Sequence, residues 1–135
     1  MRQKEIHLSS KTRGFHLVTD EILSHLGSLP QTGLIHLFLQ HTSAGLCINE
    51  NADPTVRKDL NEWFDRNIRE YEPYYQHTFE GSDDMPAHIK SILTGCEITL
   101  PVTDGRLNLG TWQGIYLAEF RNHGGSRKLI ATIYD

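Results

Sequence analysis

One apolar run is followed directly by a polar segment, and this pairing constrains the fold more than any other feature of the chain. Residues Leu34–Leu39 are almost wholly apolar, which predicts a strand buried on both faces. The segment His41–Pro54 then gathers an imidazole, two hydroxyls, two amides and two carboxylates. Polar loops held by rigid strands carry function disproportionately often. We therefore expect a functional site where this strand ends.

Helical spacing and end signals predict three helices. The pair Thr19–Asp20 can cap the first, which Gly27 ends, and Asp53 is a good N-cap for the second. The third is expected over residues 85–94, where a proline lies in the first turn. Strands are expected over residues 5–8, 15–18, 34–39, 45–48, 96–102, 107–109, 110–121 and 128–134. Helices in mid-chain and long strands after them favour an α+β fold, in a single domain over residues 1–135.

Charge and composition exclude several classes of protein. The chain has 13 basic and 17 acidic residues and a net charge of -4. Its overall charge therefore provides no electrostatic attraction to nucleic acid or anionic lipid. No apolar run has the length of a signal peptide or of a membrane span. Cys47 and Cys96 form no Cys-x-x-Cys pair, which favours reduced, partly buried thiols. We expect a soluble, cytoplasmic protein in which any phosphate recognition is local.

The segment Glu70–Asp84 is aromatic and acidic and has no clear periodicity. Structureless connections longer than ~12 residues are uncommon in compact domains and are often functional. We therefore expect a long functional loop here. A solvated acidic loop is the alternative for Glu80, Asp83 and Asp84.

Three of the eight histidines stand out by their context. His41 follows the central strand, His77 lies in the acidic loop and His88 falls in the first turn of the third helix. Three neutral imidazoles can hold Zn²⁺ or a similar ion and leave a coordination position open. We expect a divalent metal ion, Zn²⁺, Mg²⁺ or Mn²⁺, although the spacings match no compact metal motif and surface or capping histidines are the alternative. His36, inside the apolar strand, is expected to be a satisfied core residue.

Three residues of the polar segment are candidates for catalysis. Glu50 and Asp53 are paired carboxylates, of which one can bind a metal or its water while the other acts as general base. Asp53 as an N-cap and Glu50 as an ordinary loop acid are the alternatives. Ser43 lies two residues from His41, and a nucleophilic role for Ser43 requires the two to meet in space.

Hydroxyls and arginines offer donors for an anion. Thr42 and Ser43 supply hydroxyls at a turn, and Arg57 lies near the amino end of the second helix, where anions are favoured. Arg106 follows a predicted turn and is a further candidate. Gln113, between two glycines, can contact a polar ligand edge. None of these residues forms a phosphate-loop motif.

Several of these motifs together resemble one known family. The segments are His41–Gly45, Ile48–Pro54, Ala87–Ile89, Pro101–Val102, Gly105–Leu107 and Leu109–Gln113. They look like the YjbQ family over essentially the whole chain, and the Gly-Thr-Trp-Gln segment is close to that family's signature. In one respect the chain departs from the pattern, because Asp83-Asp84-Met85 stands where an asparagine is expected before the Ala-His pair.

The resemblance implies a YjbQ-like α+β subunit with mostly antiparallel sheets, sandwich- or barrel-like, flanked by two to three helices. It also implies a homotrimer, in which a neighbouring subunit can complete the site. The matching positions resemble the family's polar cluster: His41, Thr42, Ser43, Asn49, Glu50, Asp53, His77, His88, Thr111, Trp112 and Gln113. Within that set we expect Asn49, Thr111 and Gln113 to bind substrate.

The resemblance leaves the reaction open. The family has long been labelled uncharacterised, and some members are described as secondary thiamine-phosphate synthases. This implies a metal-dependent enzyme of small phosphorylated metabolites, such as a transferase that joins a pyrimidine diphosphate to a thiazole phosphate and releases diphosphate. A metal-dependent hydrolase and a non-catalytic trimer that binds a metabolite or metal are the alternatives.

Overall fold

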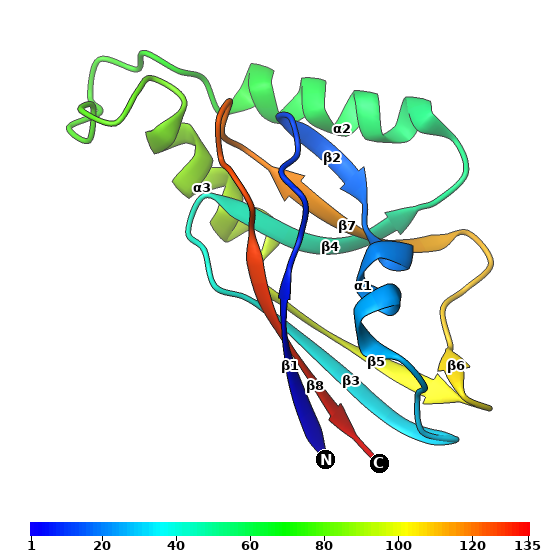
Figure 1. Cartoon of the computed structure of the whole chain (residues 1–135). Coiled ribbons are helices and arrows are strands. Elements are labelled where there is room, and N and C mark those ends of the chain that lie inside the picture. The colour runs from blue at the N-terminus through cyan, green and yellow to red at the C-terminus, as the bar shows by residue number, and fades with distance from the viewer.

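Three helices and eight strands make up the fold (Figure 1). It is described by a computed structural model that covers residues 1–135. The elements are β1 (Arg2–His7), β2 (Gly14–Leu17), α1 (Thr19–Leu26), β3 (Thr32–Leu39), β4 (Ala44–Glu50), α2 (Pro54–Asn67), α3 (Asp84–Thr94), β5 (Glu97–Thr103), β6 (Arg106–Leu107), β7 (Gln113–Glu119) and β8 (Lys128–Tyr134). None of the helices has the length and apolar character that crossing a membrane requires.

The strands form two sheets in which every pairing is antiparallel. One sheet has the order β1-β8-β3-β5-β6, and the other has the order β2-β7-β4. Their facing sides share one core with α1, to which β3 contributes Leu37, β4 contributes Leu46, β7 contributes Leu117 and α1 contributes Ile22. The expected α+β class, with antiparallel sheets and flanking helices, is confirmed.

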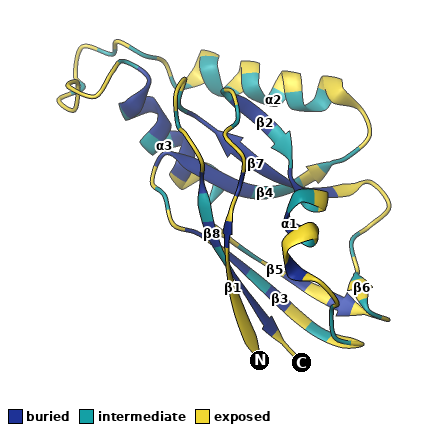
Figure 2. Ribbon diagram, viewed as in Figure 1, coloured by how far each residue is buried: buried dark blue, intermediate teal, exposed yellow.

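Helix α2 covers the other side of the three-stranded sheet. Asp53 caps it as predicted, since its Oδ1 accepts a hydrogen bond from the amide of Thr55 at 2.9 Å. Beneath the helix, Phe15 and Tyr116 belong to a second, aromatic cluster against which Phe64 packs. Most of β7 and the first residues of β4 are buried between this second cluster and the main core (Figure 2).

The expectation that β3 is buried on both faces is wrong. Ile35 and Leu37 point into the core, whereas Leu34 is 45% and Phe38 is 39% exposed. The reason is that no helix covers the outer side of the five-stranded sheet (Figure 1). His36 also lies on this outer side and contacts Glu97 at 3.0 Å, so it is not a core residue.

Helix α3 is held close against the start of β4. Gly45 permits this approach, because a Cβ atom there would overlap the side chain of Thr94. The hydroxyl of Ser91 donates to the carbonyl oxygen of Ala44 at 2.8 Å, and the amide of Leu46 donates to the carbonyl oxygen of Gly95 at 3.0 Å. These contacts set where the amino end of α3 lies relative to the turn before β4.

The two cysteines are free and partly buried, as expected. Burial raises the pKa of Cys47 to about 11, so this thiol stays protonated at neutral pH. The expected long loop is also present, since residues 68–83 between α2 and α3 contain no helix or strand.

Candidate metal-binding site

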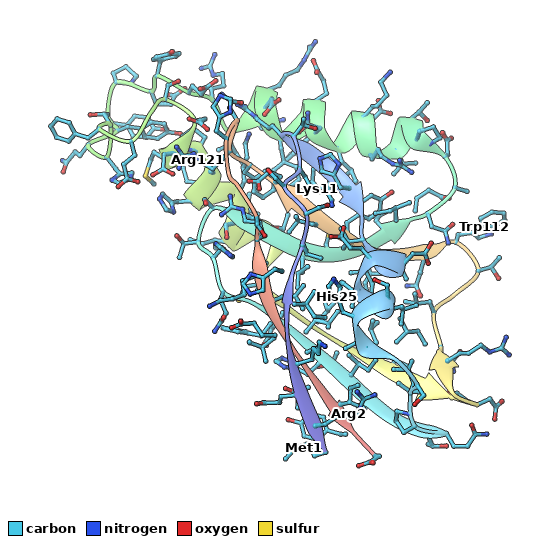
Figure 3. All side chains as sticks on the ribbon, in the orientation of Figure 1. Met1, Arg2, Lys11, His25, Trp112 and Arg121 are labelled. Carbon is cyan, nitrogen blue, oxygen red and sulfur yellow. The ribbon has the colours of Figure 1, made fainter.

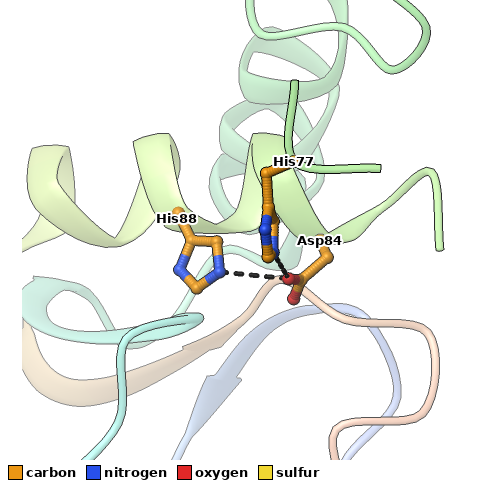
Figure 4. A group of neighbouring side chains, drawn as sticks. All are labelled: His77, Asp84 and His88. Carbon is orange, nitrogen blue, oxygen red and sulfur yellow. Dashed lines mark hydrogen bonds and ion pairs between the residues drawn. The ribbon is translucent and has the colours of Figure 1, made fainter. Parts of the chain in front are cut away.

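Two histidines and one aspartate converge at the amino end of α3 (Figure 4). Nε2 of His77 lies 2.6 Å from Oδ2 of Asp84, and Nε2 of His88 lies 3.1 Å from the same oxygen. One ligand atom from each of the three residues lies within 4.8 Å of the other two. The structure therefore joins two of the histidines expected at a metal site and adds a carboxylate.

The local sequence explains this convergence. Asp84 and His88 are four residues apart on α3, so their side chains leave the same face of the helix. Asp83 is in the N-cap position, which makes Asp84 the first helical residue. His77 comes from the loop before α3 and reaches back to that first turn.

Arg121, just after β7, holds the carboxylates of this turn in place. Its Nη1 donates to Oδ1 of Asp84 at 2.6 Å, and its Nε donates to Oδ2 of Asp83 at 2.9 Å. Asp84 is 1% exposed, and burial alone would raise its pKa. Hydrogen bonding to His77 and the positive charge of Arg121 outweigh burial and hold the pKa of Asp84 below its usual value. Asp84 is therefore a carboxylate at neutral pH.

A backbone carbonyl orients the second histidine. Nδ1 of His88 lies 2.9 Å from the carbonyl oxygen of Thr42, in the turn between β3 and β4. A carbonyl oxygen only accepts, so Nδ1 carries the hydrogen and donates it. Nε2 is then left as the ring atom that can bind a metal ion. Such partners commonly fix the tautomer of metal-binding histidines.

The set of donor atoms suits a divalent cation. Two imidazole nitrogens and one carboxylate oxygen are ligands that Zn²⁺, Mn²⁺ and Fe²⁺ accept, and three protein ligands leave further positions open. Both Nε2 atoms lie within hydrogen-bonding distance of Oδ2 of Asp84, and a bound ion would replace these two contacts. The residues at the amino end of α3 therefore fit a metal ion.

His41 lies elsewhere. Its Nε2 accepts a hydrogen bond from the amide of Lys128 at 2.8 Å, and Nη1 of Arg127 lies 3.3 Å from its Nδ1. Burial and the positive charge of Arg127 lower the pKa of His41, so the ring is neutral at pH 7. Nε2 of His41 is thus occupied by the backbone of β8, and His41 is not part of the cluster of His77, Asp84 and His88.

The turn after His41 contributes backbone rather than side chains. The carbonyl oxygen of Thr42 accepts a hydrogen bond from His88. The carbonyl oxygen of Ser43 accepts one from Nη2 of Arg127 at 3.2 Å. Ser43 is buried, and no hydrogen bond joins its hydroxyl to His41. The pairing that a nucleophilic serine needs is therefore not formed in this structure.

The expected carboxylate pair lies at the other end of β4. Oε2 of Glu50 accepts from the amide of Ala52 at 3.0 Å, while Asp53 caps α2. Asn49 uses its side-chain oxygen to accept from the amide of Glu50 at 2.8 Å. These three side chains organise the turn between β4 and α2, as the capping alternative for Asp53 implies.

The remaining expected binding residues also lie away from α3. The carbonyl oxygen of Thr111 accepts from Asn51, and Oε1 of Gln113 accepts from the amide of Gly110 at 2.8 Å. Trp112 is 64% exposed and projects at the opposite side of the molecule from Arg121 (Figure 3).

Neither of the two arginines expected to bind an anion belongs to the cluster. The guanidinium of Arg57 lies over the ring of Tyr116, 5.8 Å from its centroid. Arg106 lies on β6, beside a shallow cavity lined by Leu23, Leu29 and Leu109. The structure therefore does not join these arginines to His77, Asp84 and His88.

Sequence reasoning missed the role of Asp84 and of Arg121. The four-residue interval between Asp84 and His88 at a helix start was a usable signal for the first. No sequence signal marks Arg121, because its role depends on the end of β7 lying beside the start of α3. Glu80, for which a solvated loop residue was the alternative, has an exposed side chain whose Oε2 is 3.6 Å from Nε2 of His77.

The fold and the cluster define a small α+β protein with a partly exposed cluster of two histidines and one carboxylate. The sequence model of the family described as "UPF0047 protein YjbQ-like" matches residues 4–135. The chain belongs to this family, as the sequence motifs predicted.

Relatives and solved structures agree with this membership. The chain is 56% identical over 133 residues to the UPF0047 protein YjbQ of Escherichia coli O157:H7, covering 97% of this chain and 96% of that protein. It is 44% identical over 119 residues to the UPF0047 protein sll1880 of Synechocystis, covering 88% and 80%. The crystal structure of the conserved hypothetical protein TT1486 from Thermus thermophilus superposes with a TM-score of 0.85 at 35% identity, covering 96% and 98%.

Proposed function

We propose that this protein is a metal-dependent enzyme that hydrolyses a small phosphorylated or amide-containing metabolite. One divalent ion would be held by His77, Asp84 and His88. The observation that carries the proposal is the convergence of both Nε2 atoms on Oδ2 of Asp84, at 2.6 and 3.1 Å. A site with three protein ligands and open positions is the pattern of catalytic rather than structural metal centres.

The surrounding residues have separate tasks in this proposal. A bound divalent ion would supply a Lewis acid and would lower the pKa of a coordinated water to ~7. Glu80 is the candidate general base, since its carboxylate is largely exposed and lies 3.6 Å from Nε2 of His77. Arg121 and the carbonyl oxygen of Thr42 keep Asp84 and His88 oriented.

Hydrolysis fits the site better than transfer from a diphosphate. A transferase of that kind needs cations beside the departing diphosphate, where charge develops in the transition state. Arg121 is the arginine at the cluster, and it already donates to Asp83, Asp84 and the carbonyl oxygen of Glu80. A water-derived nucleophile requires no such cradle.

A metal-reconstitution assay tests the proposal. Chelator-treated protein is reloaded with Zn²⁺ or Mn²⁺ and supplied with a panel of phosphate esters and amides, and separately with a pyrimidine diphosphate plus a thiazole phosphate. We expect metal-dependent turnover of one substrate with water. Asp84→Asn should lower the rate at least about a hundredfold, because losing even the positioning partner of a ligand typically costs about 10- to 100-fold. His36→Gln on the outer sheet face should leave the rate unchanged.

Two outcomes contradict the proposal. Formation of thiamine phosphate that depends on Asp84 identifies a transferase instead. Metal and metabolite binding without turnover of any substrate in the panel identifies a binding module, as in the third alternative drawn from the sequence.

We also propose that the chain assembles as a homotrimer, as its resemblance to the family implies. Leu34 and Phe38 on the uncovered face of β3 offer apolar surface for a subunit contact. The polar residues around Glu50 and Gln113 lie at the end of β4 that is far from His88. In a trimer, these residues of one subunit could instead approach the cluster of His77, Asp84 and His88 in a neighbouring subunit.

A further inference from the structure

A cavity of about 300 Å³ opens beside the metal-binding cluster, in the loop that joins α2 to α3. Its walls include Tyr71, Tyr75 and Met85, together with Glu72 and His77. Because Nε2 of His77 also faces Oδ2 of Asp84, one side chain belongs to both the cavity and the cluster. A molecule in this cavity would therefore lie next to a bound ion.

The walls favour a flat and electron-poor ligand. Aromatic rings present a negative face that attracts cations, and a thioether such as that of Met85 makes favourable contacts with aromatic rings. The size is at the lower end of the ~300–1,000 Å³ of small-molecule sites, which suits one or two fused rings.

The lining of the cavity offers a carboxylate and no lysine or arginine, and this favours a cation over an anion. No lysine or arginine lines the cavity, whereas Glu72 does. Arg69, which is not part of the lining, lies 3.3 Å from the Glu72 carboxylate. Across residues 70–84 the loop has five acidic residues and no lysine or arginine. Arginines from outside the loop pair with four of these carboxylates, those of Glu70, Glu72, Asp83 and Asp84. A phosphate group would find no cationic partner in this lining.

We propose that this cavity binds a planar, cationic heteroaromatic group of the substrate and presents the adjoining bond to the ion at His77. Binding of the ring defines the class of substrate. Presentation of the adjoining bond to an ion rests on the proposed function. Binding of the ring itself needs only the loop. The two parts can therefore be tested separately.

Tyr71 offers the sharpest variant. It has φ 61°, a left-handed backbone conformation that is rare for an aromatic residue, and its side chain is largely exposed at the cavity wall. Leucine also carries a Cβ atom, so Tyr71→Leu removes the aromatic face without changing the backbone requirement. Tyr74, which is exposed in the same loop and does not line the cavity, gives the matched control Tyr74→Leu.

The test uses N-methylquinolinium and 2-naphthoate, two probes of similar ring size and opposite charge. Binding is measured by titration calorimetry and by ligand-observed NMR on the full chain, first without metal and then with Mn²⁺. We expect N-methylquinolinium to bind at least about tenfold more tightly than 2-naphthoate to the metal-free protein. Tyr71→Leu should weaken this binding about threefold to tenfold, in line with the loss of one cation–π contact, and Tyr74→Leu should leave it unchanged.

Mn²⁺ then tests whether cavity and cluster adjoin. The paramagnetic ion should broaden the NMR signals of bound N-methylquinolinium in the wild type and not in Asp84→Asn. Equal or tighter binding of 2-naphthoate, or no effect of Tyr71→Leu in a folded protein, overturns the inference. Metal uptake without binding of N-methylquinolinium overturns the inference alone, whereas binding of the probe without metal uptake overturns the proposed function and leaves the cavity's preference intact.

Discussion

At the scale of single residues, Asp84 divides its two carboxylate oxygens between two sets of partners. Oδ1 accepts from Arg121, and Oδ2 faces His77 and His88. The arginine therefore fixes the carboxylate while leaving the second oxygen free to bind an ion. Partners of this kind commonly matter nearly as much as the ligands themselves.

Replacing Arg121 should weaken metal binding without removing a ligand. Arg121→Gln is expected to raise the dissociation constant for Zn²⁺ about 10- to 100-fold, because Asp84 loses its positioning partner. Arg121→Lys should have a smaller effect, since it keeps the charge but not the forked contact with Asp83 and Asp84. Competition with a chromophoric chelator measures both constants, and an unchanged constant in folded Arg121→Gln contradicts this role.

A second buried arginine has a structural task. Nε of Arg127 donates to Oε1 of Glu119 at 2.8 Å, and Nη2 donates to Oε2 at 2.5 Å, with both side chains almost fully buried. This pair joins the end of β7 to the residue just before β8, and Arg127 also donates to the carbonyl oxygen of Ser43. It thereby holds the turn from which Thr42 orients His88.

Breaking this pair on one side should be costly. Arg127→Met leaves the Glu119 carboxylate buried without its partner and is expected to lower the free energy of unfolding by about 3–5 kcal/mol. The double variant Glu119→Gln/Arg127→Met should lose less, because the uncompensated charge is gone. Urea unfolding measures both values, and a double variant less stable than Arg127→Met counts against this explanation.

At the scale of elements, one ion pair joins the two helices on either side of the long loop. Asp65 of α2 accepts from Nζ of Lys90 on α3 at 2.6 Å and from Nη2 of Arg13 at 2.8 Å. Burial alone would raise the pKa of Asp65, but these hydrogen bonds outweigh it and lower the pKa below its usual value. Lys90 is almost fully buried, and Asp65 is the acidic partner of its Nζ.

The pH dependence of stability should report this link. A carboxylate whose folded pKa is depressed stabilises the fold above its ordinary pKa and loses that effect as the pH falls through the folded value. The difference in free energy of unfolding between wild type and Asp65→Asn should therefore be constant from about pH 5 to 7 and shrink below about pH 4. A difference that stays constant down to about pH 3 contradicts the assignment.

The sequence predicted those helix ends and turns that depend on the type of one or two neighbouring residues. Asp53 caps α2, Gly27 ends α1, and the Asp104-Gly105 turn precedes β6, each as predicted from residue type. The exposure of Leu34 was not predictable in this way. An apolar run shows that a strand can be buried on both faces, but whether a second layer covers each face depends on distant parts of the chain.

At the scale of the whole molecule, the same limit applies to the site. His77 and His88 were expected to share a site, and the structure brings them together. His41 is held apart because its Nε2 accepts from the backbone of Lys128, a contact that exists only once β8 has paired with β3. Such a partner, 87 positions away, leaves no trace in the local sequence.

The state of assembly is a further property of the whole molecule. Size-exclusion chromatography with light scattering should give a mass three times that of the 15.4 kDa chain. Leu34→Glu and Phe38→Glu place charges on the uncovered face of β3 and should shift the protein toward monomer without unfolding it. A monomeric wild type at micromolar concentration contradicts the homotrimer.

The central claim is that His77, Asp84 and His88 hold one divalent ion, and metal analysis of single variants tests it most directly. Purified wild type loaded with Zn²⁺ and dialysed should retain one ion per chain by elemental analysis. His77→Ala, Asp84→Asn and His88→Ala should each lose it, while His41→Ala and His36→Gln should keep it. Retention of a full equivalent by any of the first three variants, or no bound ion in the wild type, would contradict the account.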